Sequence, residues 1–127
     1  MPGSNVFEYA VIRIVPRVER EEFINAGVIL FCKGEKTLDC IINVDDQKLR
    51  AFVAGDDLDD IRANLNAFSR ICKGDQQCGP IATLDQASRF RWLTATRSTV
   101  VQASKVHPGL TGDAAKTLQK LFEQLVA

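Results

Sequence analysis

The chain begins with three segments whose apolar residues form patterns typical of strands. Residues 6–15 place apolar side chains on both faces of an extended chain, which is typical of a strand that is covered on two sides. Residues 25–32 are almost continuously apolar, and in residues 37–44 most apolar side chains share one face. A Lys-Gly-Glu-Lys turn at 33–36 separates the last two segments. The pattern predicts three strands, of which the second and third form a hairpin.

After residue 44 the apolar residues recur at helical spacing. Asp45 or Asp46 is expected to cap a short helix that Gly55 ends. Asp56 or Asp57 is expected to cap a longer helix to about residue 73. The two segments therefore predict consecutive helices after the strands.

The last third of the chain mixes both patterns. Residues 74–80 are typical of a loop, and Thr83 with Gln86 has the spacing of a capping box, which predicts a helix that reaches residue 93. Residues 98–104 predict a fourth strand and residues 107–112 a loop. A final helix is expected to start at Thr111 or Asp113.

The predicted order of elements is βββαααβα, with strands first and helices afterwards. This order favours an α+β fold with a mostly antiparallel sheet of about four strands and helices packed on it. A length of 127 residues and an apolar content of 46% suffice for one core, so residues 1–127 are expected to form a single domain.

Charge and hydropathy exclude some classes of function. Sixteen basic and sixteen acidic residues give a formal net charge of zero, which argues against broad nucleic-acid binding because phosphate neutralisation dominates that affinity. No apolar run approaches the ~20 residues of a membrane span. Residues 1–5 do not begin a secretion signal, so a cytoplasmic location is expected.

The four cysteines do not have the spacing of metal ligands. None belongs to a C-x2-C pair, so we expect no metal and no cofactor. Cys32, Cys40 and Cys72 fall on apolar faces and are predicted to be buried. Cys78 lies in a loop and is predicted to be an exposed free thiol, and free thiols fit the cytoplasm.

Residues 88–99 are the most informative stretch for function. They carry Arg89, Arg91 and Arg97, and no acidic residue occurs between Asp85 and Asp113. Arginine forks suit carboxylate or phosphate oxygens, and Ser98 at a strand start can add donors. The stretch predicts an anion site, with a neighbouring aromatic ring as a stacking surface.

A purely structural alternative is open for the same stretch. The arginines could pair with the acidic cluster Asp56, Asp57, Asp59 and Asp60, while Phe90 and Trp92 fill the core. A neutral chain supplies enough carboxylates for such pairing.

Arg13, Asn25 and His107 complete the candidate site. Arg13 lies within the first strand on the face of Tyr9, where a charge must be paired, for example with Asp39, or reach water. Asn25 precedes Ala-Gly at the start of a strand, which suggests a bulge or close backbone approach, and it would cap the turn or orient a ligand. His107 follows the fourth strand and is a candidate acid or base.

The sequence contains no catalytic constellation. It has no phosphate-binding glycine loop, no HExxH and no G-x-S-x-G. The leading hypothesis is therefore a non-enzymatic binding or accessory module that contacts a protein partner or an anionic ligand. The alternative is an enzyme for a phosphate-bearing nucleotide or nucleic acid, in which Arg13, Arg91 and Arg97 hold the anion and His107 transfers protons. A nucleic-acid binder is the third hypothesis.

Three blocks of sequence resemble a known family. Residues 9–16, 22–30 and 90–99 are similar, in order and spacing, to the short bacterial proteins known as domain of unknown function 3037, and the His-Pro-Gly-Leu segment at 107–110 is similar to a late loop of that family. The resemblance covers most of the chain. It implies a bacterial protein without a known activity and, as a partner, a kinase-like protein of the HipA type.

Overall fold

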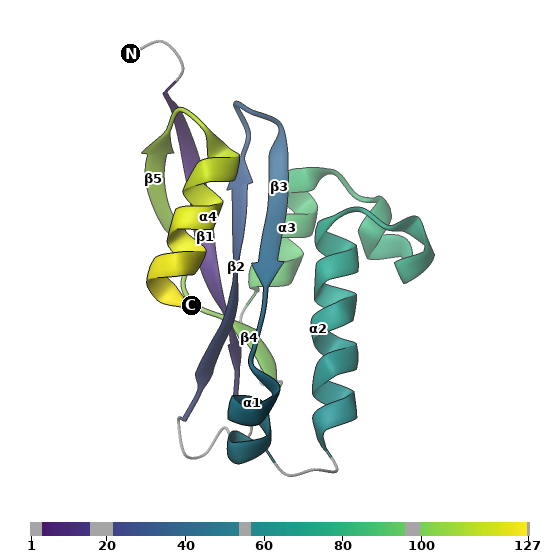
Figure 1. Cartoon of the computed structure of the whole chain (residues 1–127). Helices are drawn as coiled ribbons and strands as arrows, with labels where there is room; N and C mark the ends of the chain where they lie inside the picture. The colour runs from purple at the N-terminus through teal and green to yellow at the C-terminus, as the bar shows by residue number, and fades with distance from the viewer. Residues whose placement is uncertain (1–3, 16–21, 54–56, 96–99, 127) are drawn as a thin grey trace.

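A computed structural model describes residues 4–15, 22–53, 57–95 and 100–126 of the chain. Its elements are β1 (Asn5–Ile14), β2 (Ile24–Cys32), β3 (Thr37–Ile42), α1 (Asp46–Phe52), α2 (Leu58–Cys72), the 3-10 helices η3 (Gln76–Cys78) and η4 (Pro80–Thr83), α3 (Gln86–Thr94), β4 (Val101–Ala103), β5 (His107–Thr111) and α4 (Ala114–Leu125). The sheet is antiparallel, with α4 on one face and α2 and α3 on the other (Figure 1). The predicted α+β class is confirmed.

Strand β1 is the centre of the sheet. The strand order is β3-β2-β1-β4, and β5 also pairs with β1. The first half of β1 pairs with β5 and the last three residues pair with β4, so these two short strands lie along the same edge of β1. The sheet therefore has five strands, one more than the sequence predicts.

Ser104 joins the two short strands to β1. Its backbone N–H donates to the carbonyl of Val11 at 2.8 Å, and its hydroxyl Oγ accepts from the N–H of Val11 at 2.8 Å. The serine side chain thus takes the place of the carbonyl that a regular ladder would supply. Because Ser104 is buried, this contact satisfies a backbone donor that water does not reach.

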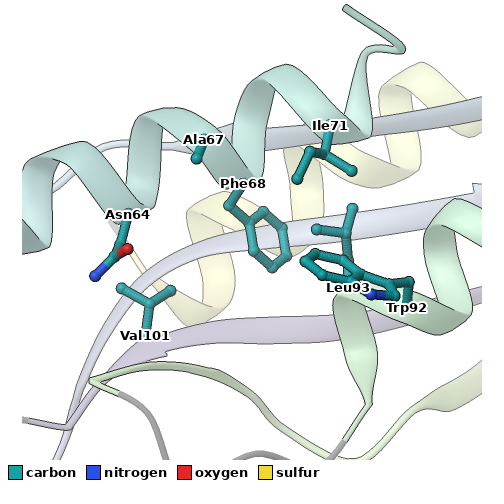
Figure 2. Close-up of a pocket in the computed structure, with 7 residues that line it drawn as sticks. All are labelled: Asn64, Ala67, Phe68, Ile71, Trp92, Leu93 and Val101. Carbon is teal, nitrogen blue, oxygen red and sulfur yellow. The ribbon is translucent and has the colours of Figure 1, made fainter. Parts of the chain in front are cut away.

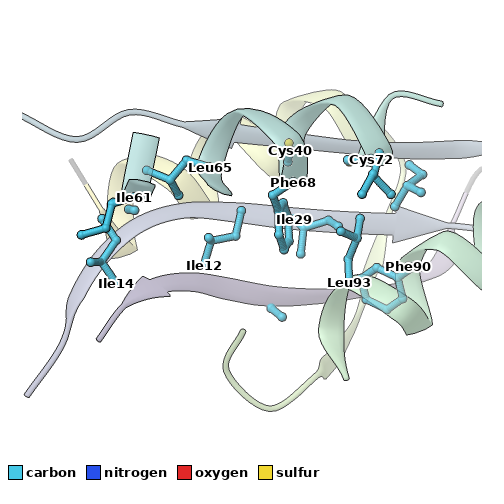
Figure 3. Close-up of a cluster of buried hydrophobic side chains, with 14 of the residues drawn as sticks. Ile12, Ile14, Ile29, Cys40, Ile61, Leu65, Phe68, Cys72, Phe90 and Leu93 are labelled. Atoms are coloured by element: carbon cyan, nitrogen blue, oxygen red, sulfur yellow. The ribbon is translucent and has the colours of Figure 1, made fainter. Parts of the chain in front are cut away.

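Alternate residues of β1 enter two different cores. Ala10, Ile12 and Ile14 pack against helices α2 and α3, where Figure 3 shows Leu65 and Phe68 of α2 directed at the strands. Phe7 faces the other way and packs with β2 against α4. The prediction that β1 is covered on both faces is confirmed.

Helix α4 is held at both ends by side chains of the β2–β3 region. Both carboxylate oxygens of Glu35 lie 3.1 Å from the N–H of Ala114, the first residue of the helix. The amide nitrogen of Asn25 donates to the carbonyl of Leu125 at 2.9 Å, in the last turn. Both contacts satisfy groups that a helix end leaves without partners, and the acidic group lies at the end that favours negative charge.

The predicted bulge near Asn25 is present. The pairing of β1 with β2 shifts between Ile12 and Arg13, so that Ala26 has no partner across the ladder. A Cβ on the next residue, Gly27, would collide with the carbonyl oxygen of Ile41. The predicted close backbone approach is therefore confirmed as well, because only glycine fits there.

Two local predictions were wrong. Residues 107–111 are a strand and not a loop, because an edge strand tolerates Pro108 and because Gly109 has no Cβ to collide with the ring of Phe7. Helix α3 starts after Asp85 and not Thr83; the carboxylate of Asp85 accepts from the N–H of Ser88 at 2.7 Å. Residue 83 instead ends the 3-10 helix η4.

The other helix starts agree more closely with the sequence. Asp45 caps α1 and Asp113 caps α4 through side-chain hydrogen bonds. Asp57 occupies the N-cap position of α2 but makes no side-chain cap bond. Gly55 and Asp56, also predicted at helix ends, lie outside the described residues. Among the described helices, none is long and apolar enough to cross a membrane.

Replacing Ser104 with alanine tests the joint between β1 and its two short partners. Ser104→Ala leaves the buried N–H of Val11 without an acceptor, so the free energy of unfolding should fall by about 1 to 3 kcal/mol. Urea unfolding followed by circular dichroism measures this change. Ser4→Ala, which removes an exposed hydroxyl, should leave the unfolding midpoint unchanged. Equal midpoints for all three proteins would contradict the assigned role of Ser104.

Candidate functional site

A large cavity lies between the sheet and the start of α3. Its volume is about 750 Å³, within the usual range of ligand sites. We call it the basic cavity, and it is lined by Val6, Glu8, Phe31, Lys33, Lys36, Asp85, Gln86, Ala87 and Arg91. Strands β1 and β2 form its floor, the β2–β3 turn one wall and α3 the other.

Tertiary contacts fix the two walls relative to each other. The side-chain amide of Gln86 donates to the backbone carbonyl of Lys36 at 3.0 Å, which joins α3 to the turn. The rings of Phe31 and Phe90 lie 5.6 Å apart and pack α3 on the sheet. Arg91 stands one helical turn after Ala87, so both side chains line the same cavity.

The β2–β3 turn carries two lysines, and the one acidic residue between them does not pair with either. Glu35 lies between Lys33 and Lys36 in sequence, but its carboxylate is bound to the start of α4. Neither lysine side chain makes an ion pair with a described residue. The turn therefore directs its positive charge to one side and its negative charge to the other.

The basic cavity is lined by three basic and two acidic side chains, so its lining carries one excess positive charge. The carboxylate of Asp85 is the cap of α3, and hydrogen bonds from the backbone and side chain of Ser88 lower its pKa. Glu8, on the floor, is half-buried. Arg91 is exposed and makes no hydrogen bond or ion pair within the described part of the chain. Three unpaired cations thus surround one cavity.

Sequence reasoning identified Arg91 but missed Lys33 and Lys36. A lysine-rich turn is common on surfaces, and nothing in the sequence places it beside α3. The informative signal is that the only acidic residue of the turn, Glu35, is used elsewhere in the fold. That fact requires the tertiary structure.

The sheet separates Arg91 from Arg13 and His107. Arg13 and His107 lie on the face of Tyr9, which α4 covers in part; the rings of Tyr9 and His107 are 5.3 Å apart. Arg91 belongs to α3, on the opposite face. Neither Arg13 nor His107 lines the basic cavity that holds Arg91.

Arg13 and Asn25 are neighbours across the β1–β2 ladder. The guanidinium carbon of Arg13 lies 4.3 Å from the centre of the Phe23 ring, a cation–π contact, and Arg13 does not pair with Asp39. The amide nitrogen of Asn25 is used by α4, so Asn25 does not cap its own turn. Arg13 Nε and Asn25 Oδ1 are buried and have no hydrogen-bond partner among the described residues.

Trp92 belongs to a different cavity from Arg91. Figure 2 shows Trp92 and Leu93 beside Phe68 and Ile71 of α2, in an apolar groove of about 210 Å³. Phe90 is buried in the core. The predicted stacking ring next to the arginines is therefore absent from the basic cavity.

One part of the structural alternative is wrong, because Arg89 and Arg91 do not pair with Asp57, Asp59 or Asp60; another part is confirmed, because Phe90 fills the core. The ion pairs among the described residues are Arg62 with Asp46 and Arg70 with Asp75. Arg89 donates to the backbone carbonyl of Leu84 at 2.6 Å instead of to an aspartate of α2. Arg97, Ser98 and Asp56 lie outside the described residues.

The cysteines offer no exposed catalytic thiol. Cys32, Cys40 and Cys72 are buried, as predicted, and Cys78 is half-buried and not fully exposed. A hydrogen bond with Cys40 and burial raise the pKa of Cys72, which keeps it a neutral thiol. No group of three metal-ligating side chains occurs in the described ranges.

The comparisons give the chain a family. The fold is of the α+β class: an antiparallel sheet lies between a layer of helices α2 and α3 and the single helix α4, and the basic cavity lies on the α3 side. A family model described as protein of unknown function (DUF3037) matches residues 9–126, and the chain belongs to this family. This confirms the resemblance seen in the sequence. No curated protein and no solved structure matches the chain.

Alanine substitutions of Arg89 and Arg91 distinguish a structural arginine from a free one. Arg91→Ala should change the free energy of unfolding by less than about 0.5 kcal/mol, because it removes an exposed side chain without partners. Arg89→Ala should cost about 1 kcal/mol, because it removes the hydrogen bond to Leu84. Thermal and urea unfolding of the two variants measure the difference. A large loss for Arg91→Ala would show that Arg91 has an internal partner after all.

Proposed function

We propose that the chain is a non-enzymatic binding module that takes an anionic group, a carboxylate or a phosphate, into the basic cavity. The observation that carries the proposal is the meeting of Lys33, Lys36 and Arg91, none of them paired with a described residue, around one large cavity. Unpaired cations of this kind are usually solvated singly on a surface. Their convergence on a preformed hollow is a feature of binding sites.

The chemistry of the three side chains suits an anion of more than one oxygen. The guanidinium of Arg91 can bind two oxygens at once, whereas the lysine ammonium groups act as compact point charges. The apolar part of the floor, Val6 and Phe31, suits a ligand that also carries apolar groups.

The same cavity gives little support to catalysis. No histidine, serine, threonine or cysteine lines it, and Asp85 is committed to the start of α3. His107, the predicted acid or base, lies on the other face of the sheet. The enzyme hypothesis requires His107 and Arg91 to converge, so the geometry favours binding. A kinase-like partner of the HipA type stays a prediction from the family resemblance.

A nuclear magnetic resonance titration tests the proposal. Isotope-labelled protein is titrated at low ionic strength with inorganic phosphate and, separately, with citrate. Shift changes should concentrate in residues 33–36 and 85–91. Arg91→Glu should weaken binding at least about tenfold, because it replaces a charged hydrogen-bond donor by a like charge. Added sodium chloride should weaken binding too, because exposed charges are screened.

The matched control is Lys120→Glu, which makes a charge reversal of the same sign on the exposed side of α4. It should leave the affinity for both anions unchanged. Shift changes centred on Arg13 and His107, or binding that is insensitive to Arg91→Glu, would refute the assignment to the basic cavity.

A further inference from the structure

The two most exposed large apolar side chains of the described residues border the basic cavity. Val6 is 62% exposed and Leu110 is 72% exposed. They are partners in the β1–β5 ladder, so they lie side by side on one face of the sheet. Val6 itself lines the cavity. We call these two residues the apolar ridge.

The uncovered face extends from the cavity floor to the edge of the sheet. Glu8, on the floor, pairs with Pro108 of β5, and Val6 pairs with Leu110. Within β1, the buried residues under α2 and α3 begin only at Ala10. Helix α3 therefore leaves Val6 of β1 and Leu110 of β5 in solvent, next to three cations.

A small anion does not account for this surface. Phosphate or citrate would contact Lys33, Lys36 and Arg91 and leave the apolar ridge in water. Adjacent apolar side chains and unpaired cations together complement a partner that carries acidic and apolar groups at neighbouring positions. A polypeptide segment meets this requirement because its side chains supply both along a few residues.

Strand addition at β5 fits the surface less well than docking on its face. Pro108 removes one N–H from the short β5 strand, and proline on an edge strand hinders pairing with a further strand. The apolar ridge also points from the face of the sheet and not from its edge. The occupant is therefore expected to lie across the face and into the basic cavity.

A second copy of the chain is a weaker candidate than a different protein. The acidic residues at the start of α2, Asp59 and Asp60, are followed by Ile61, which is buried in the chain's own core. Within the described helix α2, no large apolar side chain is exposed beside them, so this segment does not present acidic and apolar groups together. A partner that presents both is therefore expected to be a different protein.

We infer that the basic cavity and the apolar ridge together bind an acidic, amphipathic segment of a partner protein. The inference rests on the proposed function, because it uses the same three cations. The inference goes further by naming the class of ligand. Val6 and Leu110 would contact an apolar side chain of the partner segment that lies between its acidic residues.

A phage library of random twelve-residue peptides tests the inference. The library is selected on the wild-type chain and depleted on the Arg91→Glu variant. Enriched peptides should interleave Asp or Glu with Leu, Ile or Phe. One enriched peptide is then synthesised, and its affinity is measured by calorimetry for wild type, Arg91→Glu and Leu110→Ser. The control is Phe23→Ser, which removes an exposed ring that contacts Arg13 on the opposite face of the sheet.

Leu110→Ser should weaken the affinity for the peptide at least fivefold and leave the affinity for phosphate unchanged. Arg91→Glu should weaken both affinities, and Phe23→Ser should change neither. Selection of no peptides, or of peptides without acidic residues, overturns the inference. So does sedimentation that shows self-association abolished by Leu110→Ser, because the occupant would then be a second copy. If phosphate still binds in these cases, the proposed function stands; if phosphate binding also fails, both fall.

Discussion

The hydrogen-bonding and burial requirements of β1 are the constraint on which the rest of the structure depends. The strand is paired along both edges, and its residues from Ala10 to Ile14 contribute buried side chains on both faces of the sheet. Each backbone donor and acceptor in this buried part therefore needs a partner within the protein. Ser104 meets the requirement where the ladder is interrupted, by accepting the N–H of Val11 through its side chain. The alternation along β1 then assigns α2 and α3 to one core and α4 to the other.

The sequence allowed the elements that depend on local patterns to be predicted. The two apolar faces of β1, the hairpin of β2 and β3, and the bulge before Gly27 all follow from spacing and from glycine placement. Strand β5 was missed because Pro108 and Gly109 are typical of loops. The edge position, which tolerates Pro108, and the Phe7 ring, which leaves room only for glycine at 109, are visible in the structure alone. The start of α3 was misplaced because Thr83 and Asp85 are both good caps by residue type.

The candidate site was harder to predict than the fold. Arg91 stood out because its neighbourhood lacks acidic residues, but grouping it with Arg13 and His107 required a knowledge of which face each occupies. Arg91 lies on one face of the sheet, and Arg13 and His107 lie on the other, although all three are basic residues. Conversely, Lys33 and Lys36 approach Arg91 through a contact between Gln86 and a backbone carbonyl fifty residues away, which no local pattern records.

The engagement of Glu35 with α4 has a consequence for how rigid the basic cavity is. The β2–β3 turn is fastened to α4 through Glu35 and to α3 through the carbonyl of Lys36, so its backbone is immobilised from both layers. The entropy of ordering this loop is therefore lost once, during folding, and does not have to be lost again when a ligand arrives. Only the side chains of two lysines and one arginine remain free to rotate. The backbone around the cavity is therefore preorganised before a ligand binds.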